Sequence, residues 1–252
     1  MTSIALITGA TAGIGAEFAR QLAARHCSLV LVARDRDRLE AAAATLSKDF
    51  GVVVQVIPAD LGTKDGLAAV EARLAETVHP VDLLVNNAGF GLITTFHESP
   101  IEDEMRHLDL LVAVPMRLSH TALGQMVPRH HGTIINVASV AGYTPRGTYG
   151  AAKAWVLSFS RWANIHYRRH GITVTAVAPG FVHTEFHQRM KARTDNIPKA
   201  LWLTPDRVVA DALRAAAKGR AVTVPALRYK VIVALSRILP PRLVAAGALR
   251  GR

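Results

Sequence analysis

Short apolar runs rich in β-branched residues recur along the chain. They lack the alternation of apolar and polar positions that marks a strand with one face in water. Uninterrupted hydrophobicity indicates strands covered on both faces, which is typical of a parallel sheet. Seven runs fit this pattern and predict strands at residues 3–8, 28–33, 52–57, 81–85, 133–138, 172–178 and 221–224.

Longer amphipathic stretches separate these runs, spaced as the crossover helices of a parallel sheet would be. They predict helices at residues 16–25, 37–49, 64–78 and 205–218, among others. Together the two patterns predict an α/β fold, a Rossmann-type doubly wound sheet of about seven parallel strands with helices on both faces. No internal repeat or flexible linker divides the chain, so residues 1–252 are expected to form a single domain.

Length and composition fit one soluble domain. The chain has 252 residues, half of them apolar, which suffices for one sizeable core. The single cysteine, Cys27, excludes an internal disulfide, and the chain starts without a basic segment ahead of its first apolar run. A reducing, cytoplasmic location is therefore expected. No apolar run approaches the ~20 residues that a membrane-spanning helix needs.

The net charge of +11 would suit an acidic partner such as nucleic acid, an anionic membrane or a phosphate-bearing ligand. The basic residues are scattered, mostly on helical stretches with Asp or Glu nearby. They are not interleaved with aromatic residues, as they would be on a surface that binds single strands. We therefore expect a small-molecule ligand and no nucleic-acid partner, and we expect no metal site.

A glycine-rich turn follows the first predicted strand and leads directly into a helical pattern; it reads Thr8-Gly9-Ala10-Thr11-Ala12-Gly13-Ile14-Gly15. Glycines let the backbone turn tightly and approach a pyrophosphate. The first N–H groups of the following helix supply unpaired donors and the positive end of its dipole. Any tight turn packed closely on a helix would also select glycine, so it is the position after the first strand that favours a dinucleotide site.

The second predicted strand ends at Ala33-Arg34-Asp35, where the adenosine ribose of a bound dinucleotide would lie. An acidic residue ending this strand would bind a free 2′-hydroxyl, whereas a small residue followed by arginine provides room and positive charge for a 2′-phosphate. Ala33 and Arg34 therefore favour NADP(H) over NAD(H). The alternative is that Arg34 is an ordinary charge beside a helix and Asp35 is the N-cap of that helix.

Among the four tyrosines, only Tyr149 has a lysine four residues later, Lys153. Residues four apart share a helix face, so the Lys153 ammonium is expected to lie beside the Tyr149 phenol and to lower its pKa. A phenol with a pKa lowered from ~10 can donate and accept a proton near neutral pH. The same spacing also arises by chance on exposed helices.

Further motifs stand in order at the ends of the predicted strands. After the glycine turn come Asn86-Asn87-Ala88-Gly89, Ser139, Tyr149 with Lys153, and Pro179-Gly180. In this order the motifs resemble the short-chain dehydrogenase/reductase family over nearly the whole chain. The resemblance implies a single dinucleotide-binding and catalytic domain, an oxidoreductase that exchanges a hydride between NADP(H) and a carbonyl or secondary alcohol.

The resemblance also assigns roles to residues. Ser139 would hydrogen-bond the substrate oxygen, Tyr149 would transfer its proton, and Lys153 would hold the nicotinamide ribose and bias the tyrosine. Thr184 would contact the cofactor, although it could equally cap a helix that begins near Glu185. The residues expected to bind the cofactor are Gly9, Thr11, Gly13, Ile14, Gly15, Arg34, Asp60, Leu61, Asn87, Ala88, Gly89, Tyr149, Lys153, Pro179, Gly180, Val182 and Thr184.

Two departures from the family pattern affect this site. Tyr149 follows Ser139 by 10 residues, a few fewer than is usual, so the intervening loop must take a tighter route or Ser139 must sit differently. The family commonly has an asparagine that helps to hold a relay water at the position where this chain has Leu111. A leucine side chain cannot bind water. We therefore expect the proton relay to run differently or less efficiently.

Residues 181–204 correspond to the substrate lid of the family. An apolar or lipid-like substrate fits the side chains expected to line the pocket, although most of them could instead pack the lid onto the domain. These side chains are Phe90, Leu92, Phe186, Met190 and Trp202.

Residues 227–252 form a basic amphipathic tail with Leu227, Val231, Leu235 and Leu239 spaced along one helical face. Such a tail could rest on an anionic membrane surface, but more often it docks on its own domain or on a partner subunit. The family resemblance implies a homodimer or homotetramer. An alternative function, an NADP(H)-binding regulator or scaffold with little activity, is favoured by Leu111 and the short loop before Tyr149.

Overall fold

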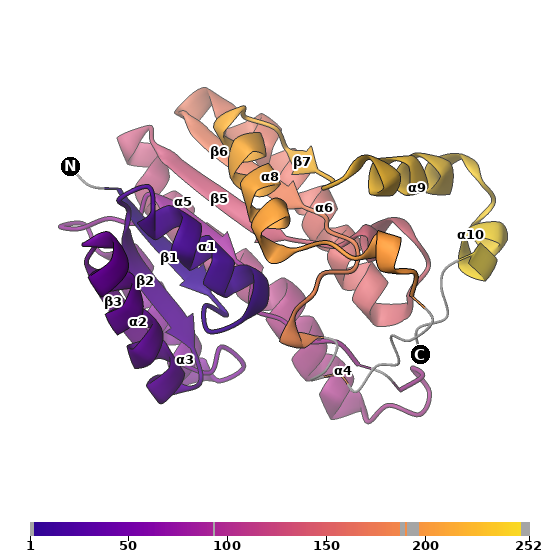
Figure 1. Cartoon of the computed structure of the whole chain (residues 1–252), viewed down its shortest axis with the longest axis horizontal. Helices are drawn as coiled ribbons and strands as arrows, with labels where there is room; N and C mark the ends of the chain where they lie inside the picture. The colour runs from indigo at the N-terminus through magenta and orange to yellow at the C-terminus, as the bar shows by residue number, and fades with distance from the viewer. Residues whose placement is uncertain (1–2, 93, 187–189, 191–196, 248–252) are drawn as a thin grey trace.

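A seven-stranded parallel sheet forms the centre of the structure, a computed structural model that describes residues 3–92, 94–186, 190 and 197–247. The strand order is β3-β2-β1-β4-β5-β6-β7 (Figure 1), which confirms the doubly wound α/β fold. The strands are β1 (Ile4–Thr8), β2 (Ser28–Ala33), β3 (Val54–Pro58), β4 (Leu83–Asn86), β5 (Gly132–Val137), β6 (Ile172–Val177) and β7 (Val222–Thr223).

Helices cover both faces of the sheet because the strands carry apolar side chains on both sides. Buried residues of α1 (Gly13–Ala23), α2 (Arg36–Phe50) and α8 (Pro205–Ala217) pack on one face, and those of α3 (Lys64–Ala75), α5 (Val114–Arg129) and α6 (Gly147–Tyr167) pack on the other. The remaining helices are α4 (Ile101–Leu108), α9 (Leu227–Ile238) and α10 (Pro241–Gly247). Among the described residues, no helix is long and apolar enough to cross a membrane.

The predicted elements appear with small shifts at their ends. β3 begins at Val54, and β7 is reduced to two residues. α3 ends at Ala75, three residues early, because Glu76 has an extended backbone. α2 begins at Arg36 because Asp35 caps it, accepting a hydrogen bond from the backbone N–H of Arg38 at 3.0 Å. The N-cap interpretation of Asp35 is thereby confirmed.

The strand order places the functional loops at one edge of the sheet. β1 pairs with β2 on one side and with β4 on the other, so the chain winds outwards in both directions from this pair. Ligands of doubly wound sheets bind beyond the carboxyl ends of the strands at such a point. The loops that follow β1, β4, β5 and β6 meet there, as their hydrogen bonds show.

Candidate active site

The glycine turn after β1 adopts backbone conformations that require glycine. Gly9 and Gly13 have φ values of +66° and +54°, in the left-handed region that other residues rarely adopt. α1 starts at Gly13, and its N-cap residue, Ala12, offers no side-chain hydrogen bond. The first N–H groups of α1 therefore keep their donor capacity for an anion at the positive end of the helix dipole.

The turn is packed so closely that a third glycine is also required. A Cβ on Gly15 would lie 2.1 Å from the carbonyl oxygen of Gly9 and 2.5 Å from the Asn87 side-chain nitrogen. That nitrogen donates to the carbonyls of Thr8, at 2.8 Å, and Gly9, at 3.2 Å. Asn87 thus ties the loop after β4 to the glycine turn, and the cradle that results fits the pyrophosphate of a dinucleotide.

Thr8 completes this connection from the end of β1. Its hydroxyl accepts the backbone N–H groups of Asn87, at 2.9 Å, and Ala88, at 3.0 Å, and donates to the Val85 carbonyl at 3.2 Å. The loop that contains Asn87 to Gly89 is therefore held in place by buried hydrogen bonds. This gives the motif a structural role whatever it contacts in a bound cofactor.

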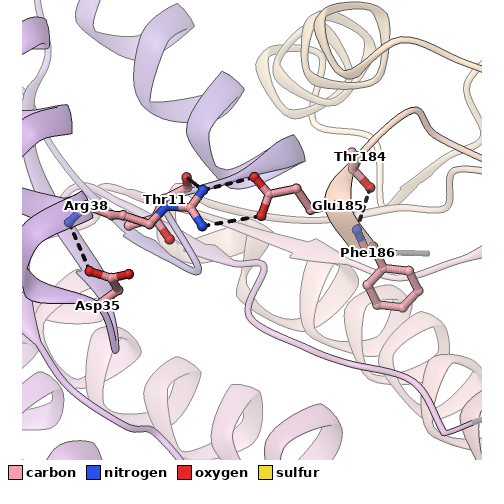
Figure 2. A network of polar contacts seen from close by, with 6 residues as sticks. All are labelled: Thr11, Asp35, Arg38, Thr184, Glu185 and Phe186. Atoms are coloured by element: carbon pink, nitrogen blue, oxygen red, sulfur yellow. Dashed lines mark hydrogen bonds and ion pairs between the residues drawn. The ribbon is translucent and has the colours of Figure 1, made fainter. Parts of the chain in front are cut away.

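Arg38 and Arg34 lie at the end of the sheet where the adenosine ribose is expected. Arg34 follows β2 and is exposed to solvent. Arg38, in the first turn of α2, reaches back to the glycine turn, where its guanidinium donates to the Thr11 carbonyl and pairs with Glu185, both at 3.0 Å. Figure 2 shows this bridge between α2 and the segment after β6. The hydrogen bond to Glu185 raises the pKa of Arg38, so its charge is permanent.

Asp60 and Leu61 lie in the turn after β3. The Asp60 carboxylate accepts the backbone N–H of Gly62 at 2.9 Å, and its carbonyl accepts the Thr63 hydroxyl at 2.8 Å. Leu61 is buried in the core beside α3, whereas Asp60 is exposed. The turn thus presents Asp60 at the carboxyl edge of the sheet, next to β2.

Ser139 and Tyr149 lie together in the structure, although the loop that joins them is shorter than is usual in the family. Residues Val140–Tyr143 form a 3₁₀ turn, which shortens the path between β5 and α6, and the Ser139 hydroxyl starts this turn by accepting the Ala141 N–H at 3.1 Å. The Ser139 side chain also hydrogen-bonds the Tyr149 phenol and lowers its pKa. The tighter route is therefore the one realised.

Lys153 lies one helical turn beyond Tyr149, on the same face of α6. Its ammonium nitrogen is 5.7 Å from the centre of the Tyr149 ring and donates to the Val137 carbonyl at 2.7 Å. Burial lowers the pKa of Lys153 to about 8. Burial also raises the pKa of Tyr149 to about 12, opposed by Ser139 and by the charge of Arg146. The expected lowering of the tyrosine pKa by Lys153 is not met here, because desolvation outweighs the nearby charges.

Leu111 is buried beside Lys153, as its position in the sequence suggested. It lies in a π-helical turn, Asp109–Ala113, and lines a cavity of about 10 Å³ together with Lys153, Asn86 and Asn136. Asn86 donates to the Asn136 side chain at 2.8 Å, while its own carbonyl oxygen has no partner among the described residues. A cavity of this size holds about one water. Two polar side chains, Asn86 of β4 and Asn136 of β5, therefore reach an otherwise mostly apolar space behind Lys153.

Four of the five predicted pocket residues belong to the loop after β4 or pack against it, and one of them, Phe186, contacts Tyr149. The Phe186 ring is 6.2 Å from the Tyr149 ring. A Cβ on Gly91 would meet the Met190 sulfur at 2.2 Å and the Phe186 ring at 3.6 Å, so Phe186 and Met190 close over the loop after β4. Phe90 belongs to that loop, as does Leu92, which is partly buried.

Trp202 lies at the far end of the same segment. Its ring stacks on His183 at 4.5 Å and lies 5.8 Å from Phe181, which fits packing of the segment onto the domain better than lining of the pocket. Much of the predicted lid, residues 187–189 and 191–196, lies outside the described residues.

The segment after β6 carries the remaining predicted cofactor residues. The Pro179 carbonyl accepts the Val140 N–H at 3.0 Å, and Val182 is buried in a bridge with Leu203. A Cβ on Gly13 would lie 2.8 Å from the Thr184 methyl group, so Thr184 adjoins the glycine turn. Its hydroxyl accepts the Phe186 N–H at 3.4 Å (Figure 2), the geometry of the alternative helix-capping role.

His107 belongs to the site although the sequence did not single it out. Its ring, only 1% exposed, stacks on Tyr149 at 6.0 Å and meets the edge of Phe90 at 5.3 Å. Its Nε2 has no hydrogen-bond partner among the described residues. Burial lowers the pKa of His107, partly offset by Glu104. A lone histidine on a helix gives no signal in sequence; only its three-dimensional proximity to Tyr149 reveals it.

Comparison with known proteins identifies the family of this site. The family model described as short chain dehydrogenase matches residues 3–195. A short-chain dehydrogenase from Sphingobium yanoikuyae, solved in complex with NADPH, is 34% identical, covers 98% of this chain and 96% of its own, and superposes with a TM-score of 0.86.

Two further relatives differ in the substrates that their names give. A bulky-bulky ketone specific alcohol dehydrogenase from Comamonas testosteroni is 31% identical over 99% of this chain and 96% of its own, with a TM-score of 0.81. Very-long-chain 3-oxoacyl-CoA reductase-B from Danio rerio is 32% identical over 212 residues, 81% of this chain and 66% of that protein. With its family match, its sheet and its nucleotide cradle, the chain belongs to the short-chain dehydrogenase/reductase family of oxidoreductases.

Proposed function

We propose that this protein exchanges a hydride between NADP(H) and the carbonyl or secondary alcohol of an apolar substrate. The observation that carries the proposal is the convergence of Ser139, Tyr149 and Lys153 at the carboxyl edge of the sheet, beside the glycine turn. The bound nicotinamide would supply or accept the hydride. Ser139 would hold the substrate oxygen, and Tyr149 would donate the proton to it during reduction.

Lys153 has two tasks in this scheme. Its buried ammonium, fixed to the Val137 carbonyl, would hold the ribose next to the nicotinamide. Its ammonium also lies 5.7 Å from the centre of the Tyr149 ring, and it would stabilise the phenolate that remains after proton donation. The small cavity behind it offers a place for a water that could return the proton, with Asn86 and Asn136 as polar groups in a mostly apolar wall that includes Leu111.

NADP(H) rather than NAD(H) is the proposed cofactor because two arginines lie at the adenosine end of the site. Ala33 leaves space at the end of β2, Arg34 is exposed there, and Arg38 lies on the adjacent turn. The relative from Sphingobium yanoikuyae was solved with NADPH. Dissociation constants for NADPH and NADH, measured for the wild type and for Arg34→Asp, test this point. A preference for NADH in the wild type would refute it.

An apolar substrate is proposed because the Phe186 ring lies beside Tyr149, the Phe90 ring lies beside His107, and Met190 packs on the same loop after β4. The names of two relatives, for bulky ketones and for very-long-chain 3-oxoacyl-CoA, point the same way. NADPH oxidation measured over bulky aryl ketones, ketosteroids, 3-oxoacyl thioesters, quinones and simple aldehydes would identify the class. Turnover confined to small polar aldehydes would exclude an apolar substrate.

The decisive experiment is Tyr149→Phe with Tyr167→Phe as its control. Tyr149→Phe removes the proton donor while keeping the ring, so turnover should fall to background while NADPH still binds. Tyr167 lies in an aromatic cluster with Trp162 and His166 at the far end of α6, and its replacement should leave turnover unchanged. Full activity of Tyr149→Phe would remove it from the proposed role.

A regulator or scaffold with little catalysis is the second candidate, and Leu111 is the residue that favours it. Tight binding of NADPH without turnover of any carbonyl in the panel would support it. The short loop before Tyr149 does not favour this candidate, because the Ser139 side chain hydrogen-bonds the Tyr149 phenol.

A homodimer or homotetramer in the cytoplasm is part of the same proposal. Exposed apolar side chains on α4, α5 and α6 support an oligomer; they include Met105, Leu108, Met116, Trp162 and Ile165. The lone Cys27, a free thiol, suits a reducing compartment. Light scattering at micromolar concentration measures the assembly, and a monomer would contradict it.

A further inference from the structure

The last long helix of the described chain, α9, exposes a row of aliphatic side chains. In Figure 1, α9 and α10 extend away from the sheet beyond β7. The opposite side of α9 is buried through Tyr229 and Val233, which are 2% and 6% exposed. The exposed row consists of Leu227, Val231, Leu235 and Ile238, which are 75%, 50%, 50% and 82% exposed. Ile238 takes the place predicted for Leu239, because α9 ends at Ile238 and Leu239 has an extended backbone.

The buried side of α9 fixes the direction of this apolar row. The Tyr229 hydroxyl accepts the Phe181 N–H at 3.0 Å and donates to the Leu201 carbonyl at 2.6 Å. Arg228 donates to the Trp202 carbonyl at 3.0 Å. These bonds hold α9 to both ends of the 181–204 loop. Because the buried side is committed to that loop, the apolar row must face outwards, on the helix that supports the proposed substrate lid.

The charged residues of the C-terminal sequence, which includes α9, have one sign. The sequence after Asp211 contains no aspartate or glutamate. Over the same stretch the basic residues are Arg214, Lys218, Arg220, Arg228, Lys230, Arg237, Arg242, Arg250 and Arg252. Two copies that paired through α9 would bring like charges together, which disfavours self-association by this face. An anionic surface is the complementary partner.

We propose that α9 docks on the surface of an anionic lipid bilayer. The apolar row would enter the boundary between headgroups and acyl chains, and Lys230 and Arg242 would lie against the headgroups. A bilayer accepts a single projecting apolar row because lipids adjust to its shape.

Docking would place the substrate lid at the membrane, where apolar carbonyl compounds concentrate. This link to substrate delivery rests on the proposed function; the membrane contact itself does not. The described ends of the lid are bonded to α9 through Tyr229 and Arg228. An apolar substrate that leaves the bilayer beside α9 would therefore have a short path to the proposed pocket.

Flotation of the full-length protein with vesicles tests the proposal. The probes are vesicles of phosphatidylcholine alone and of phosphatidylcholine with phosphatidylserine, at low and at physiological ionic strength. The wild type should bind the phosphatidylserine vesicles at least about tenfold more tightly, with a loss of affinity as salt rises. Equal binding to both vesicles, or none to either, would overturn the proposal.

Two pairs of variants separate the apolar from the charged contribution. Ile238→Glu should reduce vesicle binding at least about tenfold, whereas Val78→Glu, with the same 82% exposure after α3, should not. Lys230→Glu should weaken binding, whereas Lys48→Glu, exposed on α2, makes the same change of net charge with little effect. If each control loses as much binding as its partner, the contact is not made through α9.

A catalytic readout distinguishes this proposal from the proposed function. Ile238→Glu should reduce a water-soluble ketone as fast as the wild type does, and only the turnover of a ketone dissolved in phosphatidylserine vesicles should fall. Vesicle binding without turnover of any ketone would reject the proposed function and leave the membrane contact standing. Two results without vesicle binding would identify another partner for α9 and reject the proposal. One is a complex with an acidic protein, and the other is self-association that Ile238→Glu abolishes.

Discussion

Arg38 and Glu185 form an ion pair at 3.0 Å that joins the first turn of α2 to the segment after β6 (Figure 2). The Arg38 guanidinium also donates to the Thr11 carbonyl in the glycine turn. The ion pair therefore joins α2 to the segment after β6 across the glycine turn, where the cofactor pyrophosphate is expected to bind. Glu185 pairs with the Arg38 charge and also places a carboxylate beside the proposed phosphate site.

Glu185→Gln should tighten NADPH binding severalfold and leave NADH binding nearly unchanged. The substitution frees Arg38 for the 2′-phosphate and removes a repulsive carboxylate. Both side chains of the pair are about two-fifths exposed, so stability should change by less than about 1 kcal/mol. Fluorescence titration with the two cofactors measures the effect. Equal changes for NADPH and NADH would show that Glu185 does not face the phosphate.

The sequence sufficed for those parts of the site that local chemistry determines. The parallel strands follow from continuous apolar runs, Asp35 caps α2 through a hydrogen bond three residues ahead, and Tyr149 and Lys153 share one turn of α6. Arg38, Glu185 and His107 could not be found in this way. Their contacts span 147 residues for the ion pair, and they depend on how α2, α4 and α6 pack against the sheet.

The Tyr149 pKa illustrates a second limit of local reasoning. Spacing correctly puts Lys153 on the same helix face, but the sign of the pKa shift depends on burial, which spacing does not give. Desolvation raises the pKa of the phenol and lowers that of the ammonium, since both charged forms lose water.

Gly15→Ala should disrupt the cofactor cradle, and Gly124→Ala should not. A Cβ on Gly15 would stand 2.1 Å from the Gly9 carbonyl oxygen, whereas one on Gly124 in α5 meets nothing within 4 Å. We expect Gly15→Ala to lose about 1 to 3 kcal/mol of unfolding free energy together with NADPH affinity. Gly124→Ala should gain about 0.5 to 1 kcal/mol. Urea unfolding measures both, and an unimpaired Gly15→Ala would mean that the turn is looser than the structure has it.

Asn136→Leu should destabilise the protein more than Ser119→Ala does. Asn136 accepts from Asn86 at 2.8 Å and donates to Ser160 at 2.9 Å, all within the buried core. Ser119 contributes a single hydrogen bond to Asn86 at 3.2 Å. Unsatisfied buried groups cost about 1 to 3 kcal/mol each, so Asn136→Leu should lose at least about 2 kcal/mol and Ser119→Ala about 1 kcal/mol. Similar losses would argue against a connected network behind Lys153.

His107 should make the folded protein sensitive to acid. Burial, the largest effect, and the Lys153 charge lower the pKa of His107 below its ordinary value of 6.5, and Glu104 opposes them. The unfolded chain therefore binds more protons at this position as the pH falls through 6.5, so the unfolding free energy decreases there. His107→Phe should reduce this acid-dependent loss, whereas His97→Phe, at an exposed position, should not. Urea unfolding measured at about pH 7, 6 and 5, which spans this window, compares the unfolding free energies of the wild type and the two variants.

Lys153 should make the unfolding free energy depend on pH in the alkaline range. Its folded-state pKa of about 8 lies below the ordinary 10.5, so the unfolded chain holds more protons between these values and the unfolding free energy rises with pH across this window. Relative to Lys153→Met, the wild type should gain about 2 kcal/mol between pH 7 and pH 10. The raised pKa of Tyr149, about 12, reverses the trend only above pH 10. Lys48→Met, at an exposed position on α2, is the control. A stability difference between the wild type and Lys153→Met that stays constant with pH would mean that Lys153 is solvated in the free enzyme, and that its fixed contact with the Val137 carbonyl does not hold.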